Sequence, residues 1–183
     1  MSSPRGIIIF GANGSGKSTL GRELARALDF KCMDIEDYAF MESEIPYSKP
    51  RPHDECINLM LSDMEKHSKF VLCAVTGDFG EIIPQFYELA VYVSAPHELC
   101  MKRIEQRTID QHGDRARKGG DMHEQQLKFA DFAAKRPLNR IDQWAKTLSC
   151  PIIRVDGAKD WRNNAVDIAA HYYKLKSIEH SGI

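Results

Sequence analysis

Runs of consecutive apolar residues alternate with stretches of helical periodicity along this chain of 183 residues. Five of the runs have strand character, at residues 6–10, 30–35, 70–75, 89–93 and 152–155. Their apolar residues are continuous rather than alternating, which is typical of strands buried on both faces. The pattern therefore predicts an α/β fold, in which a five-stranded parallel sheet is flanked by helices on both faces.

The segments between these strands have helical spacing. Leu20, Leu24 and Leu28 recur on one face after the first strand, and residues 53–67 form a second candidate helix. Pro96 is expected to open a helix that runs through residue 107, since proline is favoured in a first helical turn. One apolar stripe predicts a C-terminal helix through Trp161, Ala165, Ile168, Tyr172 and Leu175.

Two segments interrupt this alternation. Residues 43–52 hold three prolines and few apolar side chains, so we expect an irregular loop there. Residues 112–121 are rich in glycine and charge and predict a flexible flap, and we place a small helical lid at residues 113–125. Pro137 should divide the helical region that follows into two helices. We expect residues 1–183 to form a single domain.

Composition narrows the classes of function. The formal net charge is −1, which argues against a nucleic-acid partner. No apolar run approaches the roughly 18 residues that span a bilayer, and the run at residues 7–10 is too short for a signal-peptide core. The five cysteines are scattered without a CxxC pair, which favours reduced thiols. We expect a cytoplasmic monomer or homodimer with no membrane partner.

The strongest chemical signal directly follows the first predicted strand, where residues 11–19 match G-x-x-x-x-G-K-[ST]. The glycines allow a tight turn whose backbone N–H groups converge on phosphates, and the following helix adds partial positive charge at its N-terminus. Lys17 should reach the β- and γ-phosphates, and the Ser18 hydroxyl should bind Mg²⁺. The predicted nucleotide site comprises Gly11, Ala12, Asn13, Gly14, Ser15, Gly16, Lys17, Ser18 and Thr19.

Acidic residues and a glycine turn follow the second and third predicted strands. Asp34 and Asp37 follow the second, and Gly77 and Asp78 follow the third. Because parallel strands end at one edge of a sheet, these residues should lie beside the phosphate loop and bind the acceptor. Asp34 is the candidate that orders Mg²⁺ or deprotonates an acceptor hydroxyl. The competing interpretation is that the aspartates cap the next helix and that Gly77 is a turn residue.

Arginines lie on the helix that leads into the flap. Arg103 and Arg107 are one turn apart, so their forked donors can converge on a phosphate and neutralise charge as the γ-phosphoryl group leaves. Arg115 can join them when the flap closes. The alternative is a solvated helix face with Glu105 and Asp110 as counterions.

In order and spacing, these motifs resemble the small P-loop kinases that include shikimate kinase, gluconate kinase and adenylate kinase. The resemblance implies ATP and Mg²⁺ as cofactors, a closing lid, and an acceptor site above the second and third strands. It also implies that Arg107 and Arg115 contact the adenine or phosphates, with Asp156 and Gly157 beside the adenine. The chain departs from the group after its third strand, where it has neither a glycine triplet nor Asp-Gly-x-Pro-Arg.

Three functions stay open on the sequence. The first is a kinase for a hydroxyl of a small metabolite, with Asp34 orienting the acceptor. The second is a nucleoside or nucleotide kinase, in which Arg51 binds an acceptor phosphate. The third is an ATPase or switch module that acts through a protein partner. A guanine-specific switch usually carries Asn-Lys-x-Asp, and the chain does not.

Overall fold

One sheet of five parallel strands organises the protein, in the order β2-β3-β1-β4-β5. The computed structural model describes residues 3–181. The central strand β1 contributes Ile7, Ile8, Ile9 and Phe10, all of which are fully buried, because helices cover the sheet on both sides. The strands are β1 (Arg5–Phe10), β2 (Lys31–Asp34), β3 (Lys69–Ala74), β4 (Tyr87–Ser94) and β5 (Ile152–Asp156).

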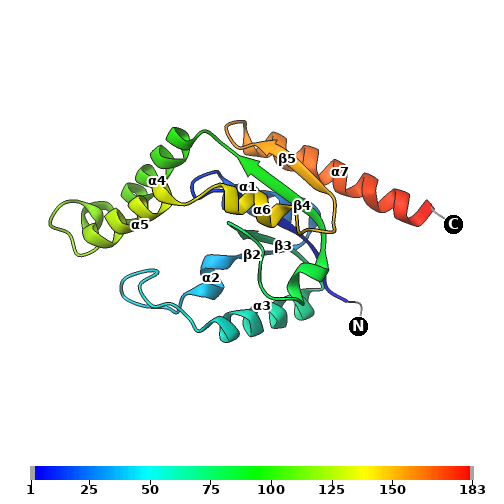
Figure 1. Ribbon diagram of the computed structural model, residues 1–183, viewed down its shortest axis with the longest axis horizontal. Coiled ribbons are helices and arrows are strands. Elements are labelled where there is room, and N and C mark those ends of the chain that lie inside the picture. Colours follow the sequence, from blue (N-terminus) through cyan, green and yellow to red (C-terminus); the bar gives the residue numbers. More distant parts are fainter. Residues whose placement is uncertain (1–2, 182–183) are drawn as a thin grey trace.

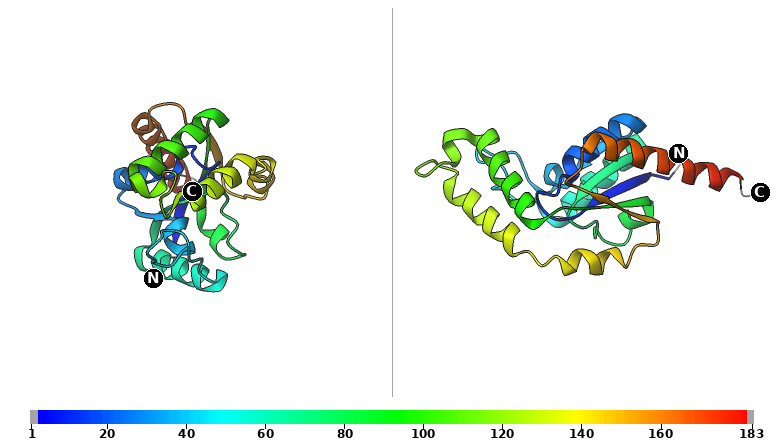
Figure 2. Two further views of the ribbon diagram at one scale, coloured as in Figure 1. Left: turned by 90° about the vertical axis from the view of Figure 1, so that its left-hand side faces the viewer. Right: turned by 90° about the horizontal axis from the view of Figure 1, so that it is seen from above.

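The helices form a layer on each face of the sheet (Figures 1 and 2). Helices α1 and α7 pack together on one face, and α3 and α6 lie on the other. Among residues 3–181, no helix has both the length and the apolar character that crossing a membrane requires. The helices are α1 (Lys17–Leu28), α2 (Ile35–Ala39), α3 (His53–His67), α4 (His97–His112), α5 (His123–Lys135), α6 (Asn139–Ala145) and α7 (Trp161–Ser181), with 3₁₀ turns η1 (Ile83–Phe86) and η2 (Gly113–Ala116).

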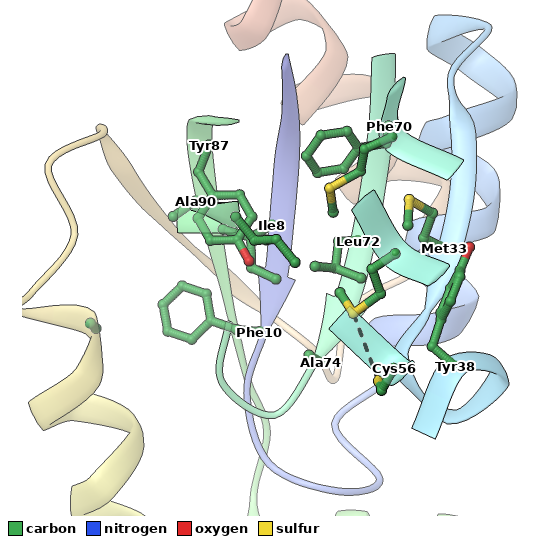
Figure 3. Close-up of a cluster of buried hydrophobic side chains, with 14 of the residues drawn as sticks. Ile8, Phe10, Met33, Tyr38, Cys56, Phe70, Leu72, Ala74, Tyr87 and Ala90 are labelled. Carbon is green, nitrogen blue, oxygen red and sulfur yellow. Dashed lines mark hydrogen bonds between the residues drawn. The ribbon is translucent and has the colours of Figure 1, made fainter. Parts of the chain in front are cut away.

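The larger hydrophobic core lies between the sheet and helices α3 and α6. Figure 3 shows Ile8, Phe10 and Leu72 on adjacent strands, with their side chains on the same side of the sheet. Trp144 from α6 meets the Phe10 ring edge-on, with centroids 4.9 Å apart. This packing fixes the end of β1, from which the chain enters the loop before α1.

The predicted five-stranded parallel sheet with helices on both faces is confirmed. The strand boundaries differ from the predicted ones by one or two residues, and two element ends have a local explanation. The second strand ends at Asp34, because the Asp34 carboxylate accepts a hydrogen bond from Glu36 N (3.2 Å) and starts α2 at once. The helix after Pro96 extends beyond the predicted residue 107 to His112, where Gly113 adopts a positive φ of 51°. Pro137 separates α5 from α6 as predicted.

The two irregular segments face each other beyond the carboxyl edge of the sheet (Figure 1). Helices α4 and α5 form an extended hairpin that carries the predicted lid, and residues 43–52 form the facing loop. They are in contact, because Gln125 Nε2 donates to Pro46 O (3.0 Å) and Arg115 Nη2 donates to Glu44 O (3.4 Å). Closure of this lid on a ligand stays a prediction.

A close approach between α1 and β3 generates a stability prediction. A Cβ added at Gly21 would lie 2.1 Å from Cys73 Sγ, and both residues are buried. Gly21→Ala should therefore lower the free energy of unfolding by about 1–3 kcal/mol, the usual cost of overpacking a core. Denaturant unfolding of Gly21→Ala, of Cys73→Ala and of the double variant tests whether the contact with Cys73 causes this loss. In the Cys73→Ala background, Gly21→Ala should leave the free energy of unfolding unchanged or raise it. An equal loss in both backgrounds would contradict a clash between the added methyl group and Cys73.

Candidate active site

The loop between β1 and α1 has the backbone that its glycines permit. Gly14 and Gly16 have φ values of 77° and 104°, in the left-handed region that favours glycine. Space is also restricted at Gly14, where an added Cβ would lie 2.3 Å from Cys100 O. Gly11 N donates to Val75 O (3.2 Å), which ties the loop to the end of β3. The loop therefore presents its backbone amides and the α1 N-terminus to one side of the sheet edge.

Lys17 is a charged residue at the centre of this loop, and its residue surface is only 9% exposed. Its Nζ donates to Ala12 O (2.7 Å), which holds the ammonium over the turn. Burial lowers the pKa of Lys17 to about 8, against the opposing influence of Cys73, Asp34 and Glu36, which favour the charged form. The site thus holds a partly desolvated cation that an anionic ligand would stabilise.

A cleft of about 570 Å³ extends from the loop along the carboxyl edge of the sheet. It is lined by seven residues of the predicted phosphate loop and its continuation into α1, from Asn13 to Thr19. Four further predicted site residues also line it: Asp34, Arg103, Arg107 and Gly157. The structure therefore brings together in one cleft segments that are up to about 140 residues apart in the chain.

Asp34 caps the N-terminus of α2, as the competing interpretation of the sequence expected. It also lines the cleft, as the proposed catalytic role requires. The Glu36 amide donates to Oδ1 of Asp34, so the cap is compatible with a ligand-directed role of Oδ2. Glu36 lines the same cleft and was missed by the sequence analysis. Burial raises the pKa of Glu36, and the neighbouring Asp34 carboxylate raises it further. The available signal was the Asp-x-Glu spacing after the second strand.

Arg103 and Arg107 approach the cleft from α4 but have different surroundings. Arg103 Nη1 donates to Gly157 O (2.8 Å) and to Ser15 O (3.3 Å), so it joins the phosphate loop to the turn after β5. Arg107 lies close enough to oppose protonation of Lys17 and to favour ionisation of Glu36. The solvated-face alternative therefore does not describe Arg103, whereas Arg107 is exposed and lines the cleft. Their catalytic roles stay predictions.

Other predicted residues lie outside the nucleotide cleft. Arg115 pairs with Asp121 (2.7 Å) on the exposed lid, and Arg51 Nε donates to Tyr38 O (2.8 Å) beside the 43–52 loop. Asp156 accepts a hydrogen bond from Ala158 N (2.9 Å) in the turn after β5. Asp37 lies in α2, one turn beyond the capping residue. Their predicted ligand contacts are untested.

Asp78 lines a second cavity beside the nucleotide cleft, and Gly77 precedes it in the chain without lining that cavity. Gly77 packs against α6, where an added Cβ would lie 2.9 Å from Trp144, and its carbonyl accepts from the Tyr87 hydroxyl (3.1 Å). Asp78 lines a cavity of about 600 Å³ together with Arg136 and Arg140. The sequence analysis missed both arginines, although Pro137 marks the turn that lies between them.

The residues of the first cleft fit a nucleoside polyphosphate with Mg²⁺. Ser15 Oγ is fully buried and has no hydrogen-bond partner among the described residues. An anion bound in the loop would lie near the Ser15 hydroxyl, the N-terminus of α1 and the Lys17 ammonium. Ser18 and Asp34, the predicted Mg²⁺ residues, line the same cleft, and oxygen atoms are the ligands that Mg²⁺ prefers.

The fold and the phosphate loop define a P-loop protein of the small-kinase fold group. The chain belongs to the AAA domain family AAA_18, whose model matches residues 7–128. It is 25% identical to the uncharacterized protein YqaC of Bacillus subtilis (strain 168) over 162 residues, which cover 83% of this chain and 88% of the relative. A shorter match, 40% identical over 52 residues, covers 28% of this chain and 28% of the "Probable gluconokinase" of Mus musculus.

Solved structures show the same architecture. A gluconokinase from Sinorhizobium meliloti 1021 matches with a TM-score of 0.57 and 14% identity, covering all of both chains. The shikimate kinase from Acinetobacter baumannii in complex with shikimate also matches with a TM-score of 0.57, at 18% identity, covering 94% of this chain and 95% of that one. At this identity the likeness shows the fold, and it confirms the predicted membership of the small P-loop kinase fold group.

The lowered pKa of Lys17 predicts a pH dependence of nucleotide binding. Below about pH 8 the ammonium is charged and available to the phosphates; above it the free protein loses that charge. The Kd for MgATP should therefore rise above pH 8, with a slope approaching about tenfold per pH unit. Calorimetric titration from neutral to alkaline pH measures this. Lys17→Arg keeps its charge and should give a nearly flat profile, so parallel profiles for the two proteins would contradict the assignment to Lys17.

Proposed function

We propose that the protein is an ATP- and Mg²⁺-dependent kinase that transfers the γ-phosphoryl group to a hydroxyl of a small metabolite. The observation that carries this proposal is the placement of a buried lysine, two carboxylates and two arginines around one cleft. Lys17 belongs to the phosphate loop, Asp34 and Glu36 follow β2, and Arg103 and Arg107 come from α4. A carboxylate with a raised pKa in a cleft is a candidate for proton transfer, which supports catalysis at this site.

The two carboxylates have different surroundings, which supports a different role for each. Asp34 is oriented by its bond to Glu36 N, which suits a group that orders Mg²⁺ through water. The pKa of Glu36 is raised because the side chain is half-buried and lies near the Asp34 carboxylate, which suits a general base. In the proposed step the acceptor oxygen attacks the γ-phosphorus, the bond to the oxygen of ADP breaks, and the hydroxyl proton passes to Glu36. When bound, Mg²⁺ neutralises charge on the phosphate oxygens.

The basic residues would stabilise the transferring group. Lys17 is the fixed cation of the loop, and Arg107 is near enough to influence both Lys17 and Glu36 electrostatically. Arg103 is bonded to two backbone carbonyls, which supports a positioning role for the loop and the turn at Gly157. Arg115 is exposed on the lid, and we propose that it reaches the phosphates only when the lid closes.

The nucleotide-kinase alternative has less support from the cleft. Its key residue, Arg51, donates to the carbonyls of Tyr38 and Phe40 and lies 3.9 Å from the Glu55 carboxylate. An arginine with these partners is less available to an acceptor phosphate. The matched gluconokinase segment adds support for a hydroxylated acceptor, because that relative is named for the phosphorylation of gluconate.

A coupled assay of ADP formation across hydroxylated metabolites, sugar acids and nucleosides tests the proposal. Turnover should be low with ATP alone and should rise strongly with one acceptor class. With that acceptor, Glu36→Gln should lower kcat by roughly 10²-fold or more, the usual scale of a lost general base. The Kd for MgATP should change little. Asp34→Asn should instead raise the Mg²⁺ concentration needed for half-maximal rate.

Glu42→Gln is a matched control, because it removes a carboxylate in the segment after α2 that does not line the cleft. It should retain the wild-type rate. Rapid ATP hydrolysis without any acceptor would favour the ATPase or switch alternative. Transfer to nucleotides that is lost in Arg51→Ala and kept in Glu36→Gln would favour the nucleotide-kinase alternative.

A further inference from the structure

Helix α7 exposes an apolar stripe on the side that faces away from the sheet. Its inner stripe, with Ala165, Ile168 and Tyr172, is buried against α1 and the sheet. On the outward side, Val166 is 66% exposed and Tyr173 is 56% exposed. Figures 1 and 2 show α7 on the outside of the molecule, with its C-terminal end extending past the sheet. The outward side is therefore open to another protein.

The outward residues have the spacing of a coiled-coil seam. The seam consists of Asn163, Val166, Ala170, Tyr173 and Ser177, which are separated alternately by three and four residues and are all exposed. This spacing keeps one side of a helix against a partner helix along the whole contact. At 1.5 Å per residue the seam is about 21 Å long. Single exposed apolar residues are ordinary, but packing of α7 on its own chain does not explain a seam opposite the buried stripe.

The sizes of the seam residues are complementary in an antiparallel pair of α7 helices. In one register, Tyr173 of each copy packs against the small Ala170 of the other. The same register packs Val166 against Ser177 of the other copy. Each layer then joins a larger residue to a small one, which fills the space between two helices without crowding.

Two charges that flank the seam favour the same register. Asp167 and Lys174 each directly follow a seam residue, and both are exposed. They are seven residues apart, about 10 Å along the axis, so they do not pair within one helix. In the antiparallel register described above, Asp167 lies opposite Lys174 of the other copy. The two-fold symmetry of the pair forms this contact twice.

We propose that the protein forms a homodimer through antiparallel pairing of its α7 helices, with Val166, Ala170 and Tyr173 in the seam and Asp167 paired with Lys174 of the second copy. A second copy fits this surface because each chain supplies both charges at the required spacing. One helix pair buries less than a standard interface of about 1,600 Å². We therefore expect a Kd on the order of 10 µM. This inference does not depend on the proposed function.

Sedimentation equilibrium of the full chain over a series of protein concentrations measures this association. At low ionic strength, the average mass should rise from that of one chain toward that of two. Tyr173→Asp should weaken the association by about 100-fold or more, because it places a charge in the seam of both copies. Leu127→Asp is the matched control, since Leu127 is also helical and 56% exposed but lies on α5. It should associate as the parent does, and circular dichroism verifies that both variants are folded.

Charge exchange tests the antiparallel register. Asp167→Lys and Lys174→Asp should each weaken self-association by about tenfold, because each places two like-charged pairs across the interface. An equimolar mixture of these two variants should restore association, since every 167–174 contact between unlike chains is again between opposite charges. The double variant should associate with itself for the same reason. Lys66→Asp makes the same change of charge at an exposed position of α3 and should associate as the parent does.

A protein that stays monomeric at millimolar concentration would overturn the proposal and leave the outward side of α7 to a different partner. A dimer that Tyr173→Asp does not weaken would also overturn it, because the interface would then lie elsewhere. Failure of the mixed charge variants to associate would reject the antiparallel pair, and with it the proposal.

Discussion

The placement of a partly desolvated ammonium at the edge of a parallel sheet is the constraint on which the site depends. Lys17 is surrounded by the loop that carries it and bonds to a carbonyl of that loop. A buried cation without a strong anion is costly, and its lowered pKa expresses that cost. Lys17 is held in this position because it is the first residue of α1. The glycines before it permit the turn that leads from β1 into that helix. A polyphosphate is the ligand that satisfies this arrangement.

The sheet order explains why distant residues meet around that cation. Strand β1 lies between β3 and β4, so the phosphate loop has the end of β3 on one side and the turns after β4 and β5 on the other. Arg103 reinforces the second side by bonding to Ser15 O and Gly157 O. Arg136 reinforces the first side through Asn13. The loop is thus held on both sides.

The sequence predicted the parts whose information is local or follows from topology. The phosphate loop is contiguous, and the position of Asp34 followed from the shared edge of parallel strands. Glu36 was missed, because its burial depends on how Asp34 starts α2. Arg136 and Arg140 were missed, because their convergence depends on the turn at Pro137 and on packing of α6 against the sheet. Sequence also cannot reveal that the donors of Arg51 point to backbone carbonyls.

The most direct test of the central claim is the ionisation of Lys17 itself. Selective ¹³C labelling of lysine side chains allows the Cε resonance of Lys17 to be followed by NMR as a function of pH, and Lys17→Arg assigns that signal by its loss. The free protein should titrate at about pH 8, and saturating MgADP should move that pKa upward, because the phosphates stabilise the ammonium. An ordinary lysine pKa in the free protein, unchanged by MgADP, would contradict the account.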